Sequence, residues 1–431
     1  MRTTTGIGTL LLACLLTACS SDSEPPPDAA PSASPSASPS AAPDDGFAPL
    51  QPPATPAEAA LRLEALVGQH SILAADMMRA RIRADSDLAQ SANAALGRNT
   101  KAMGGLLTPV LGQEGVAAFE EAWAEHIAEL FEYARGLSTG DDALRDHAHE
   151  ELVEYEADLA QFFVEASKGR LDSEAALEGV AEHVDHLVEG ADAYAAGDRS
   201  TSADRYRESY AHSFALGEAL ARALLPAAVG HQLDAPDLRL RAELTELLGE
   251  NVALVVGAMR SAVTDGADLP SLGTALDGNT QDLTAAMDAL FGRAAAQQFQ
   301  EHWADHIDEL LAYTRATAED DADGQAAARQ SLASFEQAFA GFLDETTEHR
   351  LGREALQEAF TVHDRMLLAQ LDAYAAKDYT QAHDIGYRTY DSSFTVSGRL
   401  ATAIGSTVAK RLPTGGSQTG GGGTAGMVGS R

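Results

Sequence analysis

The chain carries one long sequence pattern twice. Residues 57–225 and 238–405 align at an offset of 180 positions, or 181 in the first predicted helix. In the best-matched stretch, Gly112–Arg135 against Gly292–Arg315, 11 of the 24 positions are identical. The two tryptophans of the chain, Trp123 and Trp303, occupy equivalent positions in it. Self-similarity of this strength indicates a tandem duplication, so the two copies are expected to share one fold.

Each copy has the apolar pattern of helices throughout. Apolar residues recur at alternating spacings of three and four, most clearly over 63–77, 119–134 and 180–194. Ala, Glu, Leu and Arg dominate, and short breaks rich in Gly and Asp separate the segments. We therefore predict an all-α fold of two tandem up-and-down helical bundles, each with about six helices.

The start of the chain predicts export and a lipid anchor. Arg2 precedes an apolar stretch at residues 7–16, which is too short to span a bilayer stably. The stretch ends in Leu16-Thr17-Ala18-Cys19, which resembles the lipobox of bacterial lipoproteins. We expect Cys19 to receive a diacylglycerol, with fatty acyl chains such as palmitate, and to become the new N-terminus after cleavage before it. The alternative is a plain secretory signal in which the cysteine occurs by chance.

Cysteine usage agrees with the anchor. The only two cysteines are Cys14 and Cys19, and bulky Leu12 makes Cys14 the poorer cleavage site. The mature chain then keeps no other thiol for a disulfide, a metal site or nucleophilic catalysis.

Changes in composition divide the chain into six segments. Between the signal and the first repeat lies a stretch of Ser, Pro, Ala and Asp that cannot bury a core. The predicted segments are a signal peptide (1–18), a lipidated cysteine with a disordered tether (19–56), repeat 1 (57–225), a linker (226–237), repeat 2 (238–405) and a flexible Gly-rich tail (406–431).

The charge balance excludes one class of partner. The chain has 30 basic and 65 acidic residues, a formal net charge of -35. Such a chain cannot neutralise a phosphate backbone, so nucleic acid is excluded. Anionic lipid would also repel it, which leaves attachment to the membrane to the lipid on Cys19.

Histidines on the apolar seams of repeat 1 are the main candidates for chemistry. His70, His126, His183 and His212 belong to four different predicted helices, and Met77 lies two turns after His70. Inward-pointing imidazoles from several helices are what a metal site in a bundle core needs, and methionine favours copper. The alternative is that these histidines only form hydrogen bonds in the core and fix the helix register.

Repeat 2 retains only part of this set. His306 and His363 match His126 and His183, whereas Asn251 and Ser392 replace His70 and His212. Repeat 2 is therefore expected to be a degenerate copy of the site.

Several enzyme signatures are missing from the sequence. No glutamate precedes a histidine by three positions, as di-iron bundles require. The sequence also has no glycine-rich phosphate loop and no nucleophile elbow. We predict that the protein is not an enzyme.

Three motifs resemble those of one group of proteins. They are the Trp-x-x-His-Ile runs at Trp123 and Trp303, the Asp-Ala-Tyr-Ala-Ala-x-Asp turns at 192–198 and 372–378, and the run 210–214. They are similar to motifs of bacterial secreted and lipid-anchored helical proteins often labelled copper amine oxidase-like. The resemblance covers both repeats and implies a helical fold, with copper as a candidate metal. It does not imply oxidase activity, because the sequence lacks the Asn-Tyr-Asp/Glu context from which copper amine oxidases make their quinone.

Two functions follow as expectations. The first is a membrane-anchored extracytoplasmic lipoprotein that binds a transition metal, copper first among the candidates, in repeat 1. The second is a structural or interaction module of the cell envelope that contacts another envelope protein and holds no metal.

Overall fold

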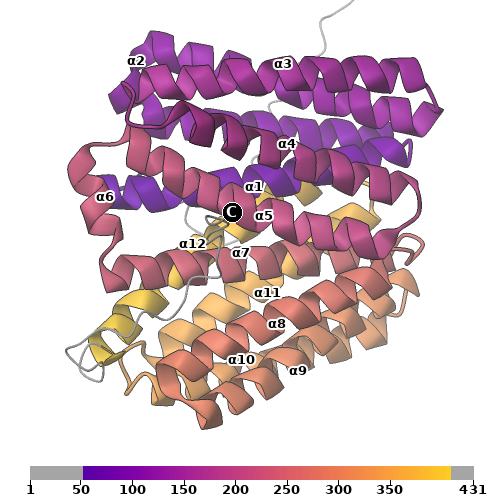
Figure 1. Ribbon diagram of the computed structural model, residues 1–431. Coiled ribbons are helices and arrows are strands. Elements are labelled where there is room, and N and C mark those ends of the chain that lie inside the picture. Colours follow the sequence, from indigo (N-terminus) through magenta and orange to yellow (C-terminus); the bar gives the residue numbers. More distant parts are fainter. Residues whose placement is uncertain (1–51, 409–431) are drawn as a thin grey trace, which may run out of the picture. The chain divides into compact units, whose positions relative to one another are not determined.

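Residues 52–408, the part described by the computed structural model, contain twelve α-helices and no strand (Figure 1). The prediction of an all-α fold is confirmed for this range. The predicted signal peptide, Cys19, residues 19–51 of the tether and residues 409–431 of the tail lie outside it.

The helices fall into two groups by their contacts. The first group comprises α1 (Pro56–Ile82), α2 (Ser86–Thr139), α3 (Asp142–Ala166), α4 (Ser173–Ala195) and α5 (Arg199–Leu224). The second comprises α7 (Pro236–Ala262), α8 (Leu269–Phe291), α9 (Arg293–Ala318), α10 (Ala322–Thr346), α11 (Arg353–Ala375) and α12 (Tyr379–Val408). The predicted linker, 226–237, contains the short α6 (Ala227–Leu233) and the start of α7.

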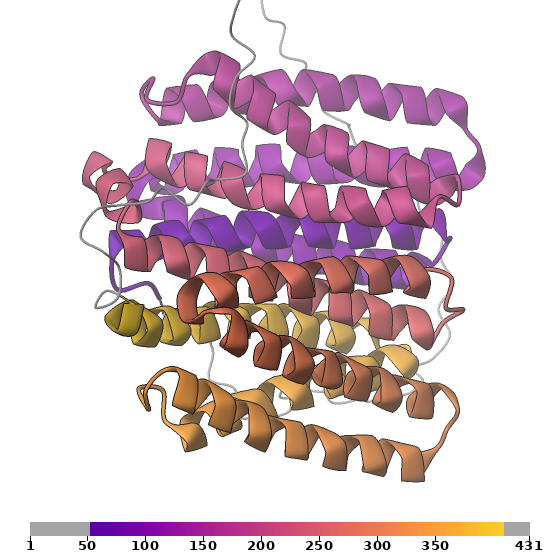
Figure 2. The same ribbon diagram turned by 60° about the horizontal axis from the view of Figure 1, so that its bottom comes forward.

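Each group closes on itself. Every helix contacts the next one along the chain, and the first contacts the last, α1 with α5 and α7 with α12. Figures 1 and 2 show neighbouring helices side by side, joined by short loops. The groups also contact each other through the pairs α1–α7, α2–α12 and α5–α8, and one hydrophobic core cluster draws residues from both.

Aspartates and glycines set the helix ends. The side chains of Asp85, Asp141, Asp172 and Asp198 accept backbone N–H bonds at the starts of α2, α3, α4 and α5. Gly112 has a φ of 69° and interrupts α2, where the second repeat instead has two helices, α8 and α9. If α2 is counted as two helical segments on either side of Gly112, each group therefore has six helical segments.

Helix α1 is buried along most of its length. It contacts α2, α4, α5 and, in the second group, α7. Its sequence is accordingly apolar or small around most of its circumference, and His70 lies in its middle with no exposed surface. Every residue from Leu63 to Ala74 is buried, so the core must satisfy the polar atoms of His70.

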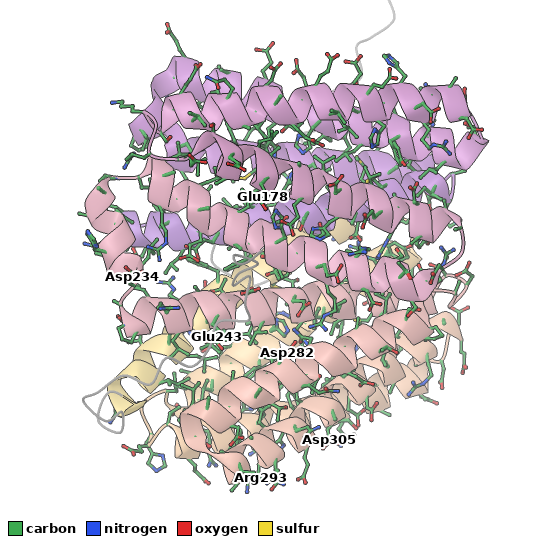
Figure 3. The ribbon with its side chains drawn as sticks, viewed as in Figure 1. Glu178, Asp234, Glu243, Asp282, Arg293 and Asp305 are labelled. Carbon is green, nitrogen blue, oxygen red and sulfur yellow. The ribbon has the colours of Figure 1, made fainter. Side chains whose placement is uncertain are left out.

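The outer surface is charged and largely acidic. Figure 3 labels six exposed charged residues, of which five are acidic: Glu178, Asp234, Glu243, Asp282 and Asp305, with Arg293. Among the helices between residues 52 and 408, none has both the length and the apolar composition needed to cross a bilayer.

The crossing of α1 and α5 depends on one glycine. A Cβ added at Gly217 would lie 2.6 Å from the Cα atom of Glu64, a backbone atom that cannot rotate away. We expect Gly217→Ala to lower the free energy of unfolding by about 1–3 kcal/mol, as overpacking does. The exposed Gly97 in α2 has open space around it, so Gly97→Ala should instead add up to about 1 kcal/mol. Urea unfolding of both variants checks this, and a loss of the same size in each would contradict the tight crossing.

Candidate metal centre

Three of the predicted histidines meet in the core of the first group. His70 of α1, His126 of α2 and His183 of α4 each offer one ring nitrogen, and these nitrogens lie within 4.8 Å of one another. The side chains are 0%, 0% and 3% exposed. Their ring centroids are 5.1 to 6.1 Å apart. We call this group the buried triad.

A chain of hydrogen bonds fixes the proton on His70. The Nε1–H of Trp123 lies 3.1 Å from His70 Nδ1, and an indole N–H can only donate. His70 Nδ1 is therefore an acceptor, and the neutral ring carries its proton on Nε2. That Nε2–H donates to His126 Nε2 at 3.0 Å. His126 must then carry its own proton on Nδ1.

The other two histidines each keep one unsatisfied nitrogen. His126 stacks on Tyr155 at 4.8 Å, and its Nδ1 has only the Trp123 carbonyl nearby, with no well-formed hydrogen bond. His183 Nδ1 lies 2.9 Å from Ser213 Oγ, while its Nε2 is buried without a partner. Buried polar atoms are rarely left unpaired, because each costs about 1–3 kcal/mol. The unpaired His126 Nδ1 carries a proton and cannot bind a metal, whereas the unpaired Nε2 of His183, beside the other two imidazoles, is consistent with a ligand site.

Burial keeps the triad neutral. It lowers the pKa of His126 to about 3. It also lowers the pKa of His70 and His183 well below the ordinary value, and the neighbouring imidazoles add to the effect. Neutral imidazole is the form that coordinates Zn, Cu, Ni or Fe. The three rings are therefore ready to bind a metal without first losing a proton to solvent.

The spacing of the triad is close to that of a metal site, but Trp123 must move. Metal–nitrogen bonds are about 2.0–2.1 Å, so nitrogens around one ion lie roughly 3.3 Å apart. The His70–His126 contact of 3.0 Å is near this value. A metal on His70 Nε2 would shift its proton to Nδ1, toward the indole N–H of Trp123. Metal binding therefore requires the Trp123 indole and the His70 ring to separate.

The structure places the fourth predicted histidine elsewhere. His212 of α5 is not in the triad; its neighbour Ser213 is the residue that faces His183. One residue turns a helix by about 100°, so His212 points away from Ser213. Its ring lies 5.5 Å from that of His186, and these two histidines form a second group with Glu182.

Met77 is fully buried in the hydrophobic cluster that also contains Trp123, and its role as a ligand stays a prediction.

In repeat 2, a carboxylate replaces the missing imidazole. His306 Nε2 pairs with Asp364 Oδ1 at 2.7 Å, where His126 contacts His70 in repeat 1. The His363 ring is 6.3 Å from His306, and burial lowers the pKa of His363 to about 4. Asn251 donates to Asn279 instead. No group of three close ligand atoms was found in repeat 2 among residues 52–408.

Three features of these sites were not predicted from the sequence: the roles of Asp364, of His186 with Glu182, and of the Trp123 indole. Asp364 stands where repeat 1 has Val184, so comparing the histidines alone did not reveal it. His186 has no histidine counterpart in repeat 2, which has Met366 there, so comparing the repeats does not point to it. The spacing of Glu182 and His186, i and i+4 on one helix face, was the available signal. Trp123 was recognised as a repeat marker, whereas its hydrogen bond to His70 required coordinates.

The two tryptophans provide a matched pair for testing the hydrogen-bond chain. Trp123→Phe removes the donor to His70 Nδ1 and leaves a buried acceptor, whereas Trp303 Nε1 has no partner to lose. Both rings are buried. We expect Trp123→Phe to cost about 1–3 kcal/mol more than Trp303→Phe. Urea unfolding without metal measures the difference, and equal losses would mean that the Trp123–His70 bond does not stabilise the core.

Comparison with known proteins gives no further assignment: no protein-family model, no curated protein and no solved structure matches this chain.

Proposed function

We propose that this chain is a membrane-anchored extracytoplasmic lipoprotein that binds one transition metal ion through His70, His126 and His183. Copper is the favoured ion, and no catalysis is assigned. The carrying observation is the convergence of three neutral, buried imidazoles from three helices within 4.8 Å. We take each helix group to be an up-and-down bundle, with the site in the core of the first.

The choice of copper rests on ligand chemistry and on the resemblance. Cu²⁺ has the highest affinity of the divalent first-row metals for nitrogen ligands, and the buried sulfur of Met77 is a soft candidate ligand. The repeats also resemble proteins labelled copper amine oxidase-like. Attachment to the membrane rests on the lipobox at Cys19, and the net charge of -35 argues against nucleic acid as a partner.

A structural or interaction module without metal is the second candidate. The observation in its favour is that both nitrogens of His70 already have partners, Trp123 and His126. In that case the histidines would fix helix register, and the acidic surface would contact another envelope protein.

Metal content separates the two candidates. The full-length protein, purified in detergent without a polyhistidine tag, is incubated with Cu²⁺, desalted and analysed by elemental mass spectrometry. We expect copper in the triad to be lost in His126→Ala and in His126→Phe, which keeps a ring against Tyr155. His306→Ala in repeat 2 is the matched control and should retain the copper. If the wild-type protein and His126→Phe hold the same amount of metal, the triad is not a metal site.

A further inference from the structure

A second cluster of ligand-type side chains lies at the surface beside the buried triad. Glu182 and His186 of α4 and His212 of α5 each offer one ligand atom, and these atoms lie within 4.8 Å of one another. Glu182 is exposed and the two histidines are half-buried, so solvent ions reach this group directly. We call it the outer cluster.

The protonation of His212 leaves two acceptors facing each other. His212 Nε2 lies 2.8 Å from the carbonyl oxygen of Gly179, which can only accept, so this nitrogen carries the proton. In the neutral ring, Nδ1 then has a free lone pair, and it lies 3.5 Å from a carboxylate oxygen of Glu182. A cation between these two acceptors would make this contact attractive, as would a proton on Nδ1.

The surroundings match those of metal-bound histidine. A ligating imidazole usually donates its other N–H to a carbonyl or carboxylate, as His212 donates to Gly179. The Nδ1 atom of His186 is buried without a partner, and its ring is 5.5 Å from that of His212. Two imidazoles and one carboxylate, with open positions toward solvent, suit Cu²⁺ or Zn²⁺.

The outer cluster and the buried triad share a boundary. His186 follows His183 by one turn on α4, and His212 is adjacent to Ser213, the partner of His183 Nδ1. An ion at the outer cluster would therefore lie next to residues that adjoin His183 and its partner Ser213.

We infer that Glu182, His186 and His212 form a second metal site, which takes the ion from solvent and passes it to the buried triad by ligand exchange. Binding at the outer cluster stands on its own geometry, whereas the transfer step rests on the proposed function of the triad. The triad has almost no exposed surface, so an ion needs such a route to reach it.

Repeat 2 guides the substitutions for the test. It has serine at the position of His212, so His212→Ser places a residue that this fold already accommodates. It has methionine at that of His186, and His186→Leu gives a similar apolar side chain without a sulfur that could bind copper. His147→Gln is the control, because His147 is an exposed histidine near a carboxylate, Glu151, on α3. All variants are made in a Trp303→Phe background, which leaves Trp123 as the only tryptophan.

Loading of the triad is followed by stopped-flow quenching of Trp123 fluorescence by Cu²⁺. We expect His186→Leu and His212→Ser to slow this quenching by at least about 10-fold, the scale on which metal-site substitutions act, while the final quenching stays unchanged. His147→Gln should load at the wild-type rate. Quenching at the wild-type rate in both outer-cluster variants would overturn the transfer step.

A triad variant separates failure of this inference from failure of the proposed function. His126→Phe should still bind one Cu²⁺ per chain in equilibrium titration, and adding His212→Ser should remove it. If His126→Phe binds no Cu²⁺, the outer site is wrong. If wild type binds one ion that His212→Ser abolishes and His126→Phe leaves in place, the outer site stands and the triad, with transfer into it, is wrong.

Discussion

Lowering the pH below about 4.5 should unfold the metal-free protein steeply, at up to roughly 7 kcal/mol per pH unit. The cause is a set of five buried histidines that the fold keeps neutral. Burial lowers the pKa of His126 and His383 to about 3 and that of His363 to about 4, and it lowers the pKa of His70 and His183 as well.

The sign follows from the proton balance. In the unfolded chain a histidine has a pKa of about 6.5, so below this pH the unfolded state binds more protons than the folded one. Each such histidine removes about 1.4 kcal/mol of stability per pH unit until its folded pKa is reached. They cost no stability above about pH 6.5, and the loss grows as the pH falls toward their folded pKa values.

Buried glutamates oppose this trend at higher pH. Burial raises the pKa of Glu64 to about 8 and that of Glu246 to about 7. Between pH 4.5 and these values the folded state keeps protons that the unfolded state releases, so these groups favour folding as the pH falls. Below about 4.5 these glutamates become protonated in both states and their opposition ends, whereas Asp76 and Asp391, whose pKa burial also raises, oppose the loss down to about pH 3.9. We therefore expect maximal stability near pH 6–7 and a steep loss below about 4.5.

His383 provides the test, because it lies outside both proposed metal sites. Its Nδ1 lies 3.0 Å from Ser91 Oγ and 3.0 Å from the Tyr379 carbonyl, and Arg260 is near its Nε2. His383→Gln should reduce the slope of stability against pH, measured by urea unfolding with a chelator, by about 1.4 kcal/mol per pH unit. The exposed His147→Gln should leave the slope unchanged. Stability that stays flat between pH 5 and 4 in the wild type would show that buried histidines do not govern acid unfolding.

Local signals made the helices predictable from sequence. Apolar spacing marks the buried face of each helix, and aspartates such as Asp85 and Asp141 stand directly before helices that they cap. These signals act within a few residues, so a single sequence is enough to read them. The contact between Tyr210 and Tyr390, 2.9 Å between hydroxyl oxygens of equivalent residues in the two repeats, involves distant positions and had no local signal.

The candidate site shows the same division. A position in the middle of an apolar seam was enough to select His70, His126 and His183, because seams of neighbouring helices face one core. It was not enough for His212, where a difference of one residue decides which way the side chain points. It also could not reveal Asp364, a carboxylate that takes the place of an imidazole across the core. Periodicity in the sequence is therefore enough to predict which histidines face a core. Which of them lie together in one site depends on how the helices are rotated and packed.

The second repeat offers the strongest test of whether three inward imidazoles make a metal site, because only two of its residues prevent it from having such a triad. Asn251 stands at the position of His70, and the Asp364 carboxylate pairs with the Nε2 atom of His306. Asn251→His together with Asp364→Val, the residue that repeat 1 has there, would bring a third imidazole to His306 and His363. The unpaired Trp303 Nε1–H would then have an acceptor, as Trp123 has in repeat 1.

In a His126→Phe, His212→Ser background, which removes both proposed sites of repeat 1, this double substitution should raise bound Cu²⁺ from none to one ion per chain. With free Cu²⁺ a thousand-fold above its dissociation constant, binding should add about 4 kcal/mol to the free energy of unfolding. Asn251→Gln with Asp364→Val is the control, because it removes the carboxylate without adding an imidazole. This control should bind no Cu²⁺ and should not be stabilised by it. If the double variant unfolds cooperatively and keeps its helical circular dichroism but binds no Cu²⁺, three inward imidazoles are not sufficient for a metal site in this fold. The assignment of the buried triad would then lose its geometric basis.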